Sequence, residues 1–169
     1  VDDRVGVTTA DDLKATLCRH SVARRDDVVA LLQDFLRIRS VNPPGDMREA
    51  ADFVRGILDR FGLEHRTVAA REDMPNIISR WNTPYVGRHL VLNGHMDVFP
   101  VSDDRLWGAE IEGGRIVARG ASDMKTGTLA SILTYRLLYP YRDRLCGALT
   151  LTVVSDEQSG GRYGTKFLF

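Results

Sequence analysis

The stretch "GALTLTVVSDEQSGG", residues 147–161, places a cluster of polar side chains directly after an apolar, alternating run. The run at 147–154 predicts a buried strand, and the glycine pair that follows permits a turn. In open α/β sheets, sites lie outside the carboxyl ends of the strands. Asp156, Glu157 and Gln158 therefore fall where such a sheet would carry a site.

Helix and strand patterns alternate upstream of this stretch. Apolar residues at helical spacing predict helices at 9–20, 28–36, 46–61 and 124–138, and a further one from 161 to the last residue. Short apolar runs predict strands at 76–81 and 89–93, and "EIEGGRIVA" predicts a hairpin that turns at 113–114. This alternation is typical of a layered α/β sheet.

Three local features add detail to these elements. Asp46 is expected to cap the third helix, with Glu49 completing a capping box and Gly62 at its C′ position. The helix at 124–138 is apolar nearly all round, which predicts that it is buried, although Lys125 is expected at the surface. Residues 1–8 are expected to form a loose tail.

The composition bounds the class of protein. The 169 residues suffice for one domain, and 23 basic residues balance 23 acidic ones, so nothing favours a nucleic-acid or membrane partner. No apolar run approaches the roughly 20 residues of a membrane span, and no signal sequence is visible, which favours the cytoplasm. Cys18 and Cys146 lack C-x-x-C spacing and are expected to be free, buried thiols. The uncapped apolar ending at 167–169 favours the N-terminal portion of a longer chain.

Three polar clusters follow strand-like runs. In "NGHMDVFP" (93–100), Asp97 is placed to orient His95 as a metal ligand, since such imidazoles usually donate their other N–H to a carboxylate. The alternative is a solvated histidine beside a turn aspartate. In "ARGASDMKTG" (118–127), Asp123 is either a helix N-cap or a carboxylate able to bridge two cations. Glu157 is either a general base or part of an acidic loop.

The order and wording of these clusters resemble a known family. "VLNGHMDVFPV", "GGRIVARGASDMKTG" and "TVVSDEQSGGRYGT" are similar to three successive motifs of the aminoacylase, acetylornithine deacetylase and succinyl-diaminopimelate desuccinylase family. These are co-catalytic zinc peptidases and amidohydrolases, and "IRSVNPPGD" (38–46) also looks like their N-terminal segment. The resemblance implies an α/β fold, a layered αβα sheet of the zinc-peptidase type. Residues 1–169 would be the N-terminal portion of its catalytic domain, without the lid or dimerisation domain.

The resemblance also implies a role for each matching residue. His95 matches a zinc ligand, Asp97 the catalytic aspartate that holds it, and Asp123 the carboxylate that bridges two metals, followed by a cis peptide. Glu157 matches the general acid/base. Gln158 falls where the family has a glutamate that ligates the other zinc. An alignment shifted by one, with Asp156 and Glu157 as the acidic pair, is the lesser alternative because it misplaces the glycines.

The resulting expectation is a metal-dependent hydrolase of an N-acyl amino acid or small peptide. It would use two Zn²⁺ ions, with Co²⁺ or Mn²⁺ as substitutes, and a water activated for attack. Gln158 predicts a weakened second metal position, and residues 1–169 alone are expected to be inactive. A homodimer is compatible with the full-length protein. Two alternatives remain: a non-catalytic or single-metal relative acting as a binding module, and a nucleotide-binding protein, which lacks the G-x-G-x-x-G motif.

Overall fold

The computed structural model describes residues 9–169, and the chain divides into two compact units, one ending at Leu31 and the other spanning Leu32–Phe169. In the first unit, α1 (Ala10–Ala23) begins at a capping box formed by Thr9 and Asp12. The next helix, α2 (Arg25–Arg37), begins in the first unit and ends in the second. Both helices confirm the predicted segments 9–20 and 28–36. The expected tail at 1–8 lies outside the described residues.

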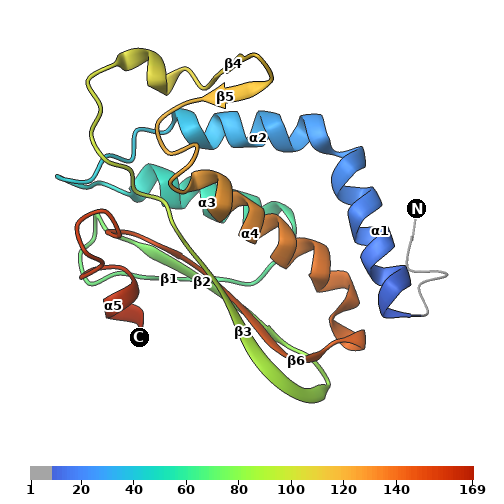
Figure 1. Cartoon of the computed structure of the whole chain (residues 1–169). Helices are drawn as coiled ribbons and strands as arrows, with labels where there is room; N and C mark the ends of the chain where they lie inside the picture. Colours follow the sequence, from blue (N-terminus) through green and yellow to red (C-terminus); the bar gives the residue numbers. More distant parts are fainter. Residues whose placement is uncertain (1–8) are drawn as a thin grey trace. The chain divides into compact units, whose positions relative to one another are not determined.

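A four-stranded sheet forms the centre of the second unit, with the strand order β1-β2-β6-β3 (Figure 1). Its members are β1 (Arg66–Val68), β2 (Asn76–Asn82), β3 (Tyr85–His95) and β6 (Cys146–Val154). The sheet is mixed, because β6 runs parallel to β3 and antiparallel to β2. The sequence did not predict β1, which is only three residues long. The expected α/β class is confirmed.

The helices α3 (Arg48–Arg60) and α4 (Lys125–Leu138) lie above the sheet in Figure 1. Along α4, Leu129, Ile132 and Tyr135 are buried, and the Tyr135 ring lies 5.8 Å from that of Trp81 on β2. Ala130 and Thr134 are exposed. The predicted burial of this helix therefore holds for one stripe, which packs on the sheet, and not for its exposed side.

The start of α3 differs from the prediction, whereas its end agrees. Met47 is the N-cap residue, and no side chain caps the helix, so the capping box of Asp46 and Glu49 is wrong. Asp46 instead pairs with the guanidinium of Arg48 and accepts a hydrogen bond from its backbone N–H at 3.2 Å. At the other end, Gly62 has a φ of +63° and the backbone hydrogen bonds of a Schellman motif follow, as predicted.

The remaining elements are short. They are η1 (Asp104–Trp107), the hairpin strands β4 (Glu110–Glu112) and β5 (Arg115–Val117), η2 (Tyr139–Arg144) and α5 (Thr165–Leu168). The hairpin turns at the predicted glycine pair. The helix predicted from residue 161 begins only at Thr165, because Gly160 and Gly161 adopt positive φ in the turn before it.

The two cysteines are both accessible to solvent. Cys18 and Cys146 are free, as expected, but both are exposed, so the prediction of buried thiols is wrong. Among the described residues, no helix is both long and apolar enough to cross a membrane.

Candidate metal centre

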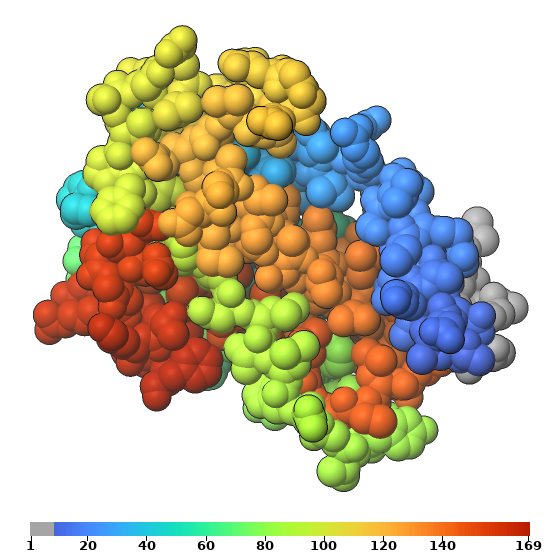
Figure 2. Space-filling model, viewed as in Figure 1, coloured from blue at the N-terminus to red at the C-terminus, as the bar shows by residue number. Residues whose placement is uncertain are grey.

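The carboxyl ends of the parallel strands β3 and β6 bring the predicted clusters together. His95, the last residue of β3, is in register with Val154, the last residue of β6. In Figure 2 the segment after β6, in red, lies at the surface next to the start of α4, in orange. A hydrogen bond from Gln158 to Asp123 joins these two segments. The predicted residues therefore lie together at the sheet edge where the sequence placed them.

His95 is held at one ring nitrogen and faces acidic oxygens with the other. Its side chain is 4% exposed. Nδ1 lies 3.3 Å from Oδ1 of Asp97 and 3.0 Å from the backbone oxygen of that residue. Nε2 lies 3.1 Å from Oδ1 of Asp123 and 3.5 Å from Oε2 of Glu157. This is the arrangement of an imidazole that is oriented from behind and presents Nε2 to a site.

Asp97 is a buried carboxylate with several hydrogen-bond donors around it. Its Oδ1 accepts from the backbone N–H of Glu157 at 3.1 Å. Its Oδ2 accepts from the backbone N–H of Gln158 and from the amide of Asn42, each at 2.9 Å. Burial alone would raise the pKa of Asp97, but the hydrogen bonds from His95, Asn42 and Gln158 outweigh burial and lower it. Asp97 is thus an anion that orients His95 and anchors the start of the loop after β6.

The charges of the neighbouring groups follow from the same contacts. Burial would lower the pKa of His95, but the carboxylates of Asp97 and Asp123 outweigh it and raise the pKa to about 9. For Asp123, the hydrogen bond from Gln158 is the main reason why its pKa lies below the ordinary value, and His95 adds to the effect. These shifts favour a protonated imidazole of His95 beside the ionised carboxylates of Asp97 and Asp123.

Asp123 and Gln158 form the exposed side of the centre. The side chain of Asp123 is 70% exposed, and its Oδ2 accepts a 2.9 Å hydrogen bond from Nε2 of Gln158. Met124, not Asp123, is the N-cap of α4, and its side chain makes no capping hydrogen bond. The N-cap alternative for Asp123 is therefore wrong. The Asp123–Met124 peptide is cis, as the resemblance implied.

Asp156 occupies a different position from Glu157. It has a φ of +69° and is buried. Its Oδ1 accepts from the amide of Asn42 at 3.1 Å, and its Oδ2 accepts from the backbone N–H of Tyr163 at 2.9 Å. Since Asp156 is engaged in this way and Glu157 and Gln158 reach His95 and Asp123, the geometry favours the unshifted alignment.

Sequence reasoning missed two buried residues of this region. The patterns in the sequence assign Asn42 no role of its own, although a polar residue before two prolines was the available signal. Lys125 is fully buried, so its predicted surface position is wrong. Its Nζ donates to the backbone oxygens of Phe35 at 2.9 Å and Ile38 at 2.7 Å, because the long stem reaches the end of α2. Burial lowers the pKa of Lys125 to about 7.

The donor set fits part of a divalent-metal position. Nε2 of His95 and Oδ1 of Asp123 are 3.1 Å apart, close to the roughly 3.3 Å that separates two ligands of tetrahedral zinc. As they stand, the two atoms share a hydrogen bond that a cation would replace. Within residues 9–169, however, no group of three or more His, Cys, Asp or Glu side chains is arranged to hold a metal ion. These residues thus offer two ligands, and further ligands would have to come from elsewhere.

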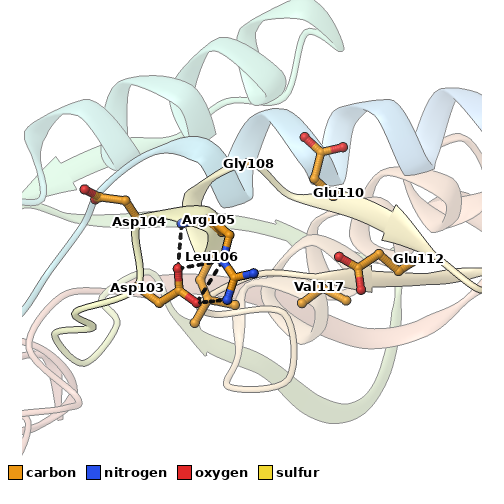
Figure 3. Close-up of a pocket in the computed structure, with 8 residues that line it drawn as sticks. All are labelled: Asp103, Asp104, Arg105, Leu106, Gly108, Glu110, Glu112 and Val117. Carbon is orange, nitrogen blue, oxygen red and sulfur yellow. Dashed lines mark hydrogen bonds and ion pairs between the residues drawn. The ribbon is translucent and has the colours of Figure 1, made fainter.

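A separate acidic pocket of about 390 Å³ lies at η1 and the β4–β5 hairpin. It contains none of the predicted site residues. Figure 3 shows the carboxylate of Asp103 bonded to Arg105, with Asp104 and Glu110 pointing away from this pair. Asp104 forms an ion pair with Arg39 at 3.1 Å. Since the acids do not converge, this pocket is not a second metal site.

Comparison with known proteins agrees with the location of the centre. The profile of peptidase family M20/M25/M40 matches residues 91–169, which include His95, Asp123 and the loop after β6. Residues 91–169 belong to peptidase family M20/M25/M40. The expected resemblance is therefore confirmed at the level of the family.

The relatives that match this chain are longer than the chain itself. It is 35% identical over 147 residues to a succinyl-diaminopimelate desuccinylase of Cereibacter sphaeroides, a match that covers 84% of this chain and 38% of the relative. It is 28% identical to an uncharacterized metallohydrolase of Methanocaldococcus jannaschii, a match that covers 85% of this chain and 39% of that relative. The chain thus spans less than half the length of these relatives.

Solved structures share the fold of this chain. A di-peptidase of Saccharomyces cerevisiae superposes with a TM-score of 0.74 at 17% identity, covering 90% of this chain and 36% of that protein. Human carnosine dipeptidase 1 superposes with a TM-score of 0.72 at 18% identity, and the match covers 92% of this chain and 37% of that protein.

Proposed function

We propose that residues 1–169 are the N-terminal portion of the catalytic domain of a metal-dependent hydrolase that cleaves an amide bond. The observation that carries this proposal is the placement of His95, with Nδ1 held by Asp97 and Nε2 directed at Asp123 and Glu157. Family membership and the desuccinylase relative support it. The substrate would be an N-acyl amino acid or a small peptide.

Each residue of the centre has a role in this proposal. His95 and Asp123 would hold one divalent cation, and Asp123 and Gln158 would contribute to a second position. Zn²⁺ suits an imidazole and a carboxylate, and Co²⁺ or Mn²⁺ could replace it. When bound, the cation supplies Lewis-acid polarisation of the scissile carbonyl and lowers the pKa of water.

Glu157 is the proposed general acid/base. Its side chain is 55% exposed, so it can reach a substrate, and Oε2 lies 3.5 Å from Nε2 of His95. Its backbone N–H is fixed by Asp97, which also orients the imidazole. The carboxylate would take a proton from the attacking water and give it to the leaving amine.

Gln158 weakens the second position in this proposal. Its amide oxygen is a neutral ligand, and in the present arrangement its amide nitrogen, not the oxygen, faces Asp123. Metal stoichiometry of the full-length protein and of its Gln158→Glu variant tests this step. A tighter second site is expected in the variant, and equal affinity for two zincs in both proteins would contradict it.

Residues 1–169 alone should show little or no activity, because the part of the chain that the structure describes offers two ligands for the cation. The full-length protein is proposed to act in the cytoplasm, where its two exposed, free thiols would stay reduced. A homodimer is compatible with this proposal.

The test of the function replaces the matching part of the Cereibacter sphaeroides desuccinylase with residues 1–169. We expect a chimera that hydrolyses an N-acyl amino acid, loses activity in a chelator and regains it with Zn²⁺. Glu157→Gln should abolish activity in the chimera while leaving metal binding intact. A folded chimera that binds zinc and is inactive, or hydrolysis by residues 1–169 alone, would contradict the proposal.

A non-catalytic or single-metal relative is the second candidate. The hydrogen bond between Gln158 and Asp123 favours it, because it satisfies the bridging carboxylate without a cation. His95→Ala distinguishes the two candidates. It should abolish metal binding if the first candidate holds and change little if the protein is a metal-free binding module.

A further inference from the structure

Asn42 joins three segments that meet behind the metal centre. Its side chain is buried, and its Nδ2 donates to Oδ2 of Asp97 at 2.9 Å and to Oδ1 of Asp156 at 3.1 Å. Its Oδ1 accepts from the hydroxyl of Ser159 at 3.0 Å. One amide thus uses both N–H groups and its oxygen on residues that flank the centre.

The backbone around Asn42 fixes the position of this amide. The N–H of Asn42 donates to the backbone oxygen of Val98, and the N–H of Val98 donates to that of Ser40, each at 2.9 Å. Ser40 also donates its hydroxyl to the backbone oxygen of Met96 at 2.6 Å. The segment with Asn42 is therefore attached to the segment that follows β3 and carries Asp97.

The chemistry of the position requires an amide. Asp97 and Asp156 are both buried carboxylates, and the two N–H groups of Asn42 lie between them. A carboxylate at position 42 would place a third acidic side chain next to Asp97 and Asp156. It would also supply neither of them with the N–H group that Asn42 provides. An apolar residue would remove a donor from each acid.

We propose that Asn42 is a positioning residue that sets Asp97 and the loop segment 156–159 relative to each other. Through Asp97 it orients His95, and through Asp156 and Ser159 it fixes the residues on both sides of Glu157 and Gln158. The imidazole and the general acid/base then meet at one point. This inference rests on the proposed function, because it assigns Asn42 a part in arranging that same centre.

A purely structural role is the alternative, and Asn76 provides its matched control. Asn76 is also a buried amide, but its partners are backbone groups: its Nδ2 donates to the oxygens of Val68, Met74 and Tyr163, and its Oδ1 accepts from the N–H of Ser155. Replacing Asn76 should weaken the fold without a selective effect on the contacts of Asp97.

Amide hydrogen exchange of the chain 1–169, without metal or substrate, tests the proposal. In Asn42→Ala and Asn42→Asp, the amides of Glu157 and Gln158 should exchange about tenfold faster or more, because their acceptor Asp97 is released. The amides of Ile77 and Leu151 in the sheet should keep their rates. In Asn76→Ala, exchange at all four amides should change together.

Unchanged exchange at Glu157 and Gln158, or a uniform change as in Asn76→Ala, would overturn the proposal. If the Asn42 variants do not fold, the same question is tested by NMR of the unsubstituted chain. The side-chain amide protons of Asn42 should exchange slowly and show couplings through hydrogen bonds to the carboxylates of Asp97 and Asp156. Absence of these couplings would overturn the proposal as well. Since neither measurement involves metal or hydrolysis, the proposed function succeeds or fails separately.

Discussion

Four acidic side chains meet at the carboxyl ends of β3 and β6, and two of them are buried whereas two are exposed. Asp97 and Asp156 are almost fully buried and accept hydrogen bonds from Asn42 and from backbone N–H groups. Asp123 and Glu157 are 70% and 55% exposed. Buried carboxylates need such donors to remain ionised, whereas exposed ones keep oxygens available for a cation or a substrate. The buried pair therefore organises the centre, and the exposed pair is available for chemistry.

The largest difference in stability between the buried and the exposed acids should appear when each side chain is replaced by alanine. Asp97→Ala leaves His95, Asn42 and two backbone N–H groups without their acceptor, and should lower the free energy of unfolding by roughly 3–5 kcal/mol. Asp123→Ala, on the exposed side, should change it by less than about 1 kcal/mol. Urea unfolding of both variants measures the contrast, and equal losses would contradict the division into buried and exposed acids.

Tyr135, a buried residue away from the centre, should make the free energy of unfolding depend on pH in the alkaline range. Burial raises the pKa of Tyr135 from 10.0 to about 12, so the neutral phenol is favoured in the fold. Its contribution is complete below pH 10 and is lost as the pH rises toward 12. This loss should amount to roughly 2–3 kcal/mol of unfolding free energy. Tyr135→Phe should remove that part of the alkaline loss, and an identical alkaline profile in the variant would contradict this cause.

A side chain added at Gly94, where β3 closely approaches α4, should have an intermediate effect on stability. A Cβ at Gly94 would lie 2.6 Å from Oγ1 of Thr128 and 3.1 Å from its Cα. Thr128 also donates to the backbone oxygen of His95 at 2.7 Å, so Gly94→Ala should disturb the buried side and cost about 1–3 kcal/mol. Gly56→Ala, in α3 with open space around it, should raise stability by about 0.5–1 kcal/mol. Thermal unfolding that shows no difference between the two would contradict the packing argument.

The smallest effect on stability is expected for a substitution on the exposed side of the centre, at Gln158. Gln158→Glu replaces a hydrogen bond to Asp123 with two neighbouring carboxylates, and should cost less than about 1 kcal/mol in a chelator. Added Zn²⁺ should reverse this loss, because a cation between the two acids is then favourable. Gln158→Met, which loses the hydrogen bond without adding charge, is the control. A zinc response in Gln158→Met equal to that in Gln158→Glu would contradict the role of this position.

The sequence predicted the residues that line the centre better than the buried contacts behind it. His95, Asp123, Glu157 and Gln158 follow strands or precede a helix, and local patterns together with the resemblance identified them. Asn42 is far from them along the chain, and its contacts with Asp97 and Asp156 depend on the tertiary fold. The burial of Lys125 likewise depends on where α2 ends. The capping box at Asp46 failed because the carboxylate pairs with Arg48 instead.

The most direct test of the central claim is a Zn²⁺ titration of the chain 1–169, followed by NMR of the histidine rings. The account predicts that Nε2 of His95 shifts on zinc binding, that Asp123→Asn weakens the effect, and that His89, which contacts Thr150, does not respond. An unchanged His95 signal, or an equal response at His89, would contradict the claim that His95 and Asp123 form part of a metal centre.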